Sequence, residues 1–165
     1  MAIKEPDFSK VKAFVLDVDG VLTDGTLYCF ESGEQVRAFN IKDGYAIRNA
    51  INKGYRVAVI TAKNERSVRM RLVQLGITDL YMGSENKLAA YHAYLADKNL
   101  EAETVLFMGD DVPDLEVMKQ TGIAACPADA ADDILEVAHY TSQRNGGKGA
   151  VREVIEKVMR EQKNW

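Results

Sequence analysis

The segment Ala13-Phe14-Val15-Leu16-Asp17-Val18-Asp19-Gly20 decides the fold, because it joins a short apolar run to two aspartates. Four apolar residues bounded by turn-forming residues predict a buried strand. In α/β proteins, ligands collect beyond the carboxyl ends of such strands. Since side chains at positions i and i+2 of extended backbone point the same way, Asp17 and Asp19 are expected to share one small volume.

Two carboxylates held this close favour a cation between them. Mg²⁺ takes its ligands from one or two carboxylates together with the phosphate oxygens of a substrate. The aspartate pair therefore predicts a magnesium-dependent phosphoryl-transfer site. Taken alone, the segment is better explained as an ordinary Asp-Gly turn. A calcium-binding loop is excluded, because the positions that would need Gly and Glu hold Leu22 and Tyr28.

The composition narrows the class of protein. The 165 residues fit one domain, residues 1–165, with a single core. The net charge of -4 gives no general field that would attract nucleic acid. Because the sequence has neither a membrane-length apolar run nor the pattern of a signal peptide, we expect a cytoplasmic protein with no membrane partner. Cys29 and Cys126 lie outside any CxxC motif and are expected to be reduced thiols.

Short apolar runs alternate with helical patterns along the chain. This alternation predicts an α/β fold, a three-layer sandwich around a mostly parallel sheet. The expected strands are residues 13–16, 56–60, 80–82 and 104–108, and the expected helices are residues 44–53, 65–75, 87–98, 113–121, 131–138 and 150–162.

Residues 26–39 separate the first strand from the first helix and predict a β-hairpin around the turn Glu31-Ser32-Gly33. Such a hairpin would stand over the site, or would serve as a sheet edge or an oligomer contact. It is too short to form a separate cap domain. The glycine-rich residues 144–149 are the one stretch whose composition predicts mobility.

Polar residues also follow three later apolar runs. Thr61 comes after residues 57–60, where its hydroxyl would suit a phosphate oxygen, although a helix-capping or core-edge role is the better explanation of a single threonine. Lys87 opens a predicted helix and would neutralise a phosphate, although a single lysine is more often exposed. Asp110 follows residues 105–108 and is predicted to bind the metal, whereas Asp111 and Asp114 would also serve as helix caps. The coincidence of all these groups at successive strand ends favours one shared site.

These motifs resemble the haloacid dehalogenase superfamily of aspartate-nucleophile phosphotransferases. The matching residues, in order, are Asp17-Val18-Asp19-Gly20, Thr61, Lys87 and Gly109-Asp110-Asp111-Val112-Pro113-Asp114. Three longer segments are similar to the capless 3-deoxy-D-manno-octulosonate 8-phosphate phosphatases: residues 17–25, 39–48 and 146–153. The resemblance covers nearly the whole chain.

The resemblance implies a Rossmann-like fold, Mg²⁺ dependence, and a homotetramer in which neighbouring subunits replace the missing cap. It implies that Asp17 is the nucleophile and that Asp19 is the general acid and base, with Thr61 and Lys87 holding the phosphoryl group. The metal ligands would be the Asp17 carboxylate, the Asp19 backbone carbonyl and Asp110. The implied substrate contacts, in addition to Asp19 and Lys87, are Asn40, Lys42, Asp43, Gly44, Arg48, Lys63 and Arg71.

One departure bears on the substrate. The family pattern after the threonine is usually Gly-Arg, whereas this chain has Ala62-Lys63. Lysine keeps the positive charge but lacks the planar fork that grips a carboxylate through two bonds. The expected reaction is therefore hydrolysis of 3-deoxy-D-manno-octulosonate 8-phosphate, with a nine-carbon sugar-acid 9-phosphate as the alternative. A magnesium-dependent phosphate-sensing module is a third interpretation, in which phosphorylation would occur once without turnover.

Overall fold

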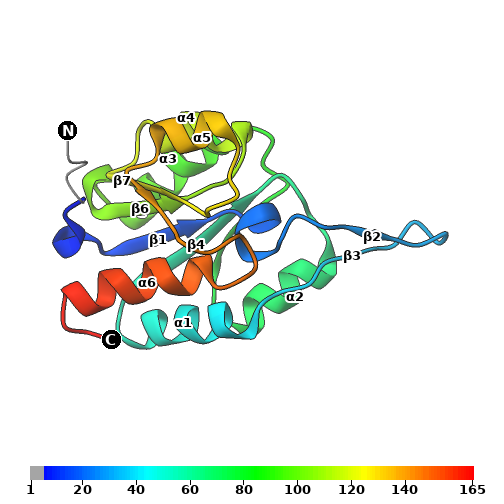
Figure 1. Cartoon of the computed structure of the whole chain (residues 1–165), viewed down its shortest axis with the longest axis horizontal. Helices are drawn as coiled ribbons and strands as arrows, with labels where there is room; N and C mark the ends of the chain where they lie inside the picture. Colours follow the sequence, from blue (N-terminus) through cyan, green and yellow to red (C-terminus); the bar gives the residue numbers. More distant parts are fainter. Residues whose placement is uncertain (1–5) are drawn as a thin grey trace.

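The computed structural model describes residues 6–165, which form a parallel sheet between two layers of helices (Figure 1). The sheet has six strands in the order β5-β4-β1-β6-β7-β8, and every neighbouring pair is parallel. The strands are β1 (Ala13–Leu16), β4 (Arg56–Thr61), β5 (Asp79–Met82), β6 (Val105–Met108), β7 (Ile123–Cys126) and β8 (Tyr140–Thr141). This arrangement confirms the predicted three-layer α/β fold.

The helices divide between the two faces of the sheet (Figure 1). One layer contains α1 (Ile41–Asn52), α2 (Arg66–Gln74) and α6 (Ala150–Glu161), and the other contains α3 (Lys87–Lys98), α4 (Leu115–Met118) and α5 (Asp132–Val137). Four single turns complete the structure: η1 (Phe8–Lys10), η2 (Val18–Leu22), η3 (Ala102–Thr104) and η4 (Val112–Asp114). Within the described residues, no helix is long and apolar enough to span a bilayer.

Strand β1 lies at the centre of the sheet and packs against both helical layers. Phe14 and Leu16 join the core beneath α1, α2 and α6, whereas Ala13 and Val15 join the core beneath α3, α4 and α5. The period-two alternation of side chains places successive residues on opposite faces. Because both faces are covered, the whole strand is apolar, and its polar continuation at Asp17 emerges at the carboxyl edge of the sheet.

The sequence pattern located most elements within a few residues, and it missed two strands. The first helix begins earlier than expected, at Ile41, because the Asn40 side chain accepts the backbone N–H groups of Lys42 and Asp43 at 2.8 and 3.4 Å. The helix expected at residues 113–121 is shorter and is split into η4 and α4. Strands β7 and β8 were not predicted, because these short segments show no clear alternation of apolar and polar residues.

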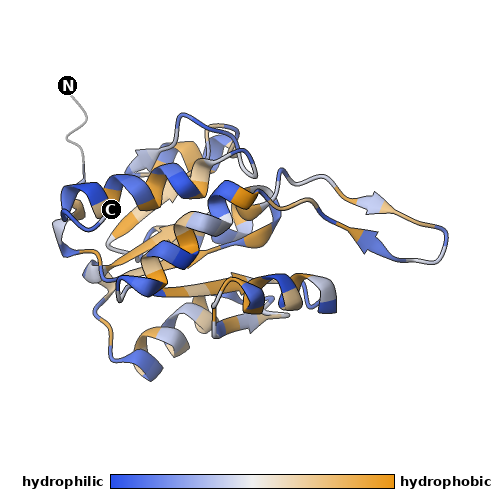
Figure 2. Ribbon diagram, turned by 90° about the horizontal axis from the view of Figure 1, so that it is seen from below, coloured by the Kyte–Doolittle hydropathy of each residue, from blue (hydrophilic) through white to orange (hydrophobic). Residues whose placement is uncertain are grey.

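The predicted hairpin is confirmed and projects away from the sheet (Figures 1 and 2). It consists of β2 (Tyr28–Cys29) and β3 (Gln35–Val36), which pair in antiparallel register. Several of its apolar side chains are exposed, namely Leu27, Tyr28, Phe30 and Val36. Figure 2 shows these hydrophobic stretches on both arms of the hairpin. A two-stranded hairpin of this kind is marginal in water without further packing.

The glycine-rich loop, residues 144–149, lies against the turn that follows β1. The backbone N–H of Gly147 donates to the Val21 carbonyl at 3.0 Å, and the Gly147 carbonyl accepts from the Asn40 side chain at 3.2 Å. The N–H of Gly146 donates to the Asp129 carboxylate at 2.9 Å. A Cβ on Gly146 would lie 1.8 Å from the carbonyl oxygen of Gly20. The loop is packed in this conformation, and its mobility stays a prediction.

We predict that Gly146→Ala lowers the free energy of unfolding by about 1–3 kcal/mol, because the added methyl group meets backbone that has no rotamer to change. Urea denaturation followed by circular dichroism measures the change. Lys148→Ala in the same loop is the control, since this exposed side chain contributes only a surface ion pair with Asp24. Equal stability of the two variants would contradict the packing described here.

Candidate active site

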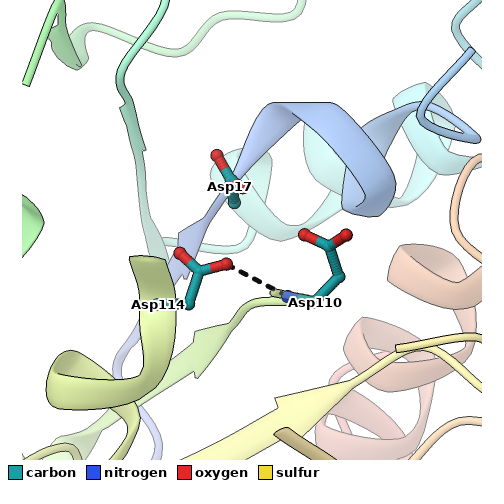
Figure 3. Close-up of side chains that lie close together, drawn as sticks. All are labelled: Asp17, Asp110 and Asp114. Atoms are coloured by element: carbon teal, nitrogen blue, oxygen red, sulfur yellow. Dashed lines mark hydrogen bonds between the residues drawn. The ribbon is translucent and has the colours of Figure 1, made fainter. Parts of the chain in front are cut away.

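The predicted functional residues converge at the carboxyl edge of the sheet. Asp17 follows β1, Thr61 ends β4, and Lys87 begins α3 after β5. Asp110 and Asp114 come from the segment that follows β6. Figure 3 shows the carboxylates of Asp17, Asp110 and Asp114 turned toward one common space. One oxygen from each of these three residues can be chosen so that all lie within 4.8 Å of one another.

Lys87 connects two of these carboxylates. Its Nζ lies 2.9 Å from Asp17 Oδ2 and 2.8 Å from Asp114 Oδ1, and all three side chains are buried. Burial alone would lower the pKa of Lys87, but the two carboxylates outweigh that effect and raise it. Lys87 is therefore a buried ammonium ion rather than the exposed lysine of the alternative interpretation.

Asp114 organises the loop that carries Asp110. Its Oδ2 accepts the backbone N–H of Asp110 at 3.1 Å, the bond drawn in Figure 3. Asp111 and Asp114 form a capping box at the start of η4, in which the Asp111 side chain accepts the Val112 backbone N–H and the Asp114 side chain accepts the Asp111 backbone N–H, so the predicted capping roles are present. A Cβ on Gly109 would lie 2.5 Å from the Asp114 side chain, which explains the glycine at that position. With both oxygens engaged, Asp114 acts mainly as a support.

Asp110 is the carboxylate of this cluster with a buried oxygen that has no hydrogen-bond partner among residues 6–165. This buried oxygen is Oδ1. The other oxygen, Oδ2, would be only 1.8 Å from a Cβ added to Gly20. Gly20 also has a φ of 85°, in the left-handed region that glycine adopts readily. An unpaired buried carboxylate oxygen next to Asp17 fits a hard divalent cation with oxygen ligands.

The pKa values of these groups reflect the excess of negative charge. Burial and the neighbouring Asp114 raise the pKa of Asp17 to about 7, against the opposing effect of Lys87. Burial raises the pKa of Asp110 to about 8, with further contributions from Asp17, Asp114 and Asp111. The single ammonium group of Lys87 does not balance three carboxylates, and a bound cation would relieve the imbalance.

Asp19 takes a different direction from Asp17. The prediction that Asp17 and Asp19 share one small volume assumed a continuous extended backbone. That extended backbone is interrupted at Val18, where the turn η2 begins. The Asp19 carboxylate pairs with the guanidinium group of Arg37, which follows β3, and the same guanidinium lies 3.4 Å from Glu65. Sequence reasoning missed Arg37 and Glu65, because their proximity to Asp19 depends on how the hairpin folds back.

Thr61 is buried, with 1% of its surface exposed. Its hydroxyl oxygen accepts the backbone N–H of Lys63 at 3.2 Å, so it stabilises the turn that leads toward α2. Lys63 itself is exposed. Thr61 does not cap α2, whose N-cap is Glu65, and its hydroxyl hydrogen can be donated to a ligand at the strand end.

The predicted substrate contacts do not form one surface within the chain. Asn40 and Lys42 line a groove of about 1260 Å³ alongside α6, and the described residues that line this groove do not include Asp17, Asp110 or Asp114. Gly44, Arg48 and Arg71 line a separate hollow of about 500 Å³.

Asp43 has a different environment, since it is 1% exposed and accepts the backbone N–H of Arg152 at 2.8 Å. This hydrogen bond connects α1 to α6. The buried side chain of Asp43 therefore gives no support to the predicted substrate contact.

The comparisons with known proteins agree with this geometry. Residues 73–155 match the family model of the haloacid dehalogenase-like hydrolases. A 3-deoxy-D-manno-octulosonate 8-phosphate phosphatase from Yersinia pestis is 42% identical over 151 residues, covering 92% of this chain and 81% of that protein.

Solved structures give the same result. A crystal structure of the phosphatase from Yersinia pestis superposes with a TM-score of 0.93 at 40% identity, over 98% of this chain and 86% of that one. The phosphatase from Moraxella catarrhalis, solved in complex with a magnesium ion, a phosphate ion and a KDO molecule, has a TM-score of 0.92 at 30% identity. That match covers 95% of this chain and 90% of the other.

Fold and site together define a hydrolase of the haloacid dehalogenase class, and residues 6–165 contain no cap domain. Within that class, the chain belongs to the family of the 3-deoxy-D-manno-octulosonate 8-phosphate phosphatases. The resemblance inferred from the sequence motifs is therefore confirmed.

We predict that the metal-free protein loses stability as the pH rises. The carboxyl groups of Asp17 and Asp110 have an ordinary pKa of 3.8 and raised values of about 7 and about 8 in the folded chain. At pH values between the ordinary and the raised pKa values, the folded state binds more protons than the unfolded state. The free energy of unfolding therefore falls as the pH increases. Mg²⁺ should therefore raise the melting temperature more at about pH 8 than at about pH 5.

Differential scanning calorimetry with EDTA or Mg²⁺ at each pH measures this effect. Asp110→Asn is the matched control, since the neutral amide should flatten the pH dependence and shrink the magnesium shift. If Mg²⁺ raised the melting temperature equally in the parent and in this variant, Asp110 would not be a ligand of the cation.

Proposed function

We propose that the chain is a Mg²⁺-dependent phosphatase that hydrolyses 3-deoxy-D-manno-octulosonate 8-phosphate through an aspartyl-phosphate at Asp17. The observation that carries this proposal is the buried pair of Asp17 and Lys87 beside the unpaired oxygen of Asp110. This arrangement combines a carboxylate nucleophile with a fixed positive charge and a place for a cation. The relatives with the same fold are named as phosphatases of this sugar acid, which supports the substrate.

Each residue has a distinct role in the proposed reaction. A carboxylate oxygen of Asp17 bonds to phosphorus while the bond from phosphorus to the sugar oxygen breaks. Asp19 gives its proton to the departing sugar oxygen, and it later takes a proton from the water that attacks the aspartyl-phosphate. Thr61 and Lys87 donate hydrogen bonds to the transferring phosphoryl oxygens. Phosphate leaves, and the Asp17 carboxylate is restored.

The cation would be held by the carboxylates of Asp17 and Asp110 and by the backbone carbonyl of Asp19. When bound, Mg²⁺ supplies charge neutralisation for the phosphoryl group and for the acidic cluster. Asp111 and Asp114 support this shell from behind, through the turn that they cap.

The proposal includes a homotetramer, since the arginines proposed to bind substrate lie apart from Asp17. The exposed apolar residues of the hairpin, together with Ile41, Tyr45, Met70 and Val73, provide surface for contacts between copies. Neighbouring copies would then supply Arg48 and Arg71 to the site. A cytoplasmic location completes the proposal and is supported by the two free cysteines, Cys29 and Cys126.

We predict phosphate release with turnover from octulosonate 8-phosphate in the presence of Mg²⁺, and loss of that activity with EDTA. The assay compares this substrate with a nine-carbon sugar-acid 9-phosphate, because Lys63 replaces the usual arginine. Higher kcat/KM for the nine-carbon substrate would transfer the assignment to it. A single stoichiometric phosphorylation without turnover would instead favour a phosphate sensor.

We predict that Asp17→Asn lowers kcat by about 10⁴-fold or more, because the amide cannot form the acyl-phosphate. Asp19→Asn should lower kcat by about 10²–10⁴-fold, the usual contribution of a general acid and base. Steady-state phosphate release measures both, with Asp24→Asn as a control at an exposed carboxylate in the same loop. Undiminished turnover by Asp17→Asn would refute the nucleophile.

A further inference from the structure

The base of the hairpin carries an arginine that reaches into the site. The Arg37 side chain is 1% exposed, although it stands next to a hairpin whose other residues are open to solvent. Its Nε donates to Asp19 Oδ1, and its Nη2 lies 3.4 Å from both Asp19 Oδ2 and Glu65 Oε1. The guanidinium group thus contacts both oxygens of Asp19 and is itself held by Glu65.

This contact joins three separate parts of the fold. Asp19 belongs to the turn after β1, Arg37 follows the hairpin strand β3, and Glu65 precedes α2. A planar guanidinium group that binds both oxygens of a carboxylate restricts where that carboxylate lies and how it is rotated. Among residues 6–165, Arg37 is the partner that fixes the Asp19 side chain, which remains about one-third exposed.

We propose that Arg37 is a positioning residue for Asp19, and that Glu65 orients Arg37 for this task. The inference rests on the proposed function, in which Asp19 transfers protons to the sugar oxygen and from water. Proton transfer requires the carboxylate within hydrogen-bond reach of the reacting oxygen. Arg37, at the base of the hairpin, holds the Asp19 carboxylate in place. Its hydrogen bonds go to Asp19 and Glu65 and not to Asp17 or Lys87.

The choice of leaving group tests this role. A sugar alkoxide needs a proton as it departs, whereas 4-nitrophenolate leaves readily without one. The ratio kcat/KM reports the steps up to release of the alcohol or phenol, before the aspartyl-phosphate is hydrolysed. Misplacement of Asp19 should therefore lower kcat/KM for the sugar phosphate and spare kcat/KM for 4-nitrophenyl phosphate.

For Arg37→Ala we expect kcat/KM for octulosonate 8-phosphate to fall by about 10- to 100-fold, and kcat/KM for 4-nitrophenyl phosphate to stay within about twofold. Arg37→Lys should lie between the parent and Arg37→Ala, because it keeps the charge and loses the two-point contact. Glu65→Gln should show the same selectivity with a smaller loss. Arg66→Ala, at an exposed arginine beside Glu65, is the control and should leave both values unchanged.

Circular dichroism and melting temperature establish that each variant is folded. If Arg37→Ala does not fold, Arg37→Lys and Glu65→Gln decide the question by the same ratio. Equal losses on both substrates, or no loss on either, would overturn the positioning role. A rise in KM alone would also overturn it, since that result identifies a direct substrate contact. If the parent hydrolyses neither compound, the proposed function fails, and this is a different result from a loss of selectivity.

Discussion

The site depends on one buried ammonium group, Lys87, that holds two carboxylates from different strands. Removing one partner of a buried ion pair typically costs about 3–5 kcal/mol, because the remaining charge is left uncompensated. Lys87 and Asp114 also connect α3 to the turn that carries Asp110. The same contacts that join the strand ends therefore fix the distance between Asp17 and Asp110. The buried Oδ1 of Asp110, which accepts no hydrogen bond from the described residues, then offers a ligand to a cation.

Close packing and charge are concentrated in the segment that follows β1. Gly20 takes a left-handed conformation beside Asp110, and the glycine-rich loop packs against the same turn. This turn sends Asp17 toward Lys87 and Asp19 toward the hairpin. Two carboxylates two residues apart thus acquire separate partners and separate environments. The difference suits a nucleophile and a proton-transfer group, because those tasks require different placement and different charge neighbours.

The sequence was sufficient where local pattern determines position. An apolar strand followed by Asp17, with polar groups after three further strands, predicted the fold and the convergence of Thr61, Lys87 and Asp110, since parallel strands end at one edge. It was insufficient where tertiary packing determines position. The pairing of Arg37 with Asp19 spans 18 residues and depends on the return of the hairpin. Likewise, Asp43 matches a family segment by position, yet the packing of α6 buries it.

The separation of the predicted substrate contacts has a structural consequence. Arg48 and Arg71 line a hollow to which Asp17, Asp110 and Lys87 do not contribute. In the proposed homotetramer, a sugar acid bound beside this cluster would meet Arg48 and Arg71 of a different copy of the chain. The exposed apolar hairpin provides a surface through which such copies can associate, and Arg37 stands at its base. Association would then complete the substrate site and, through the proposed contact of Arg37, also steady the proton-transfer group.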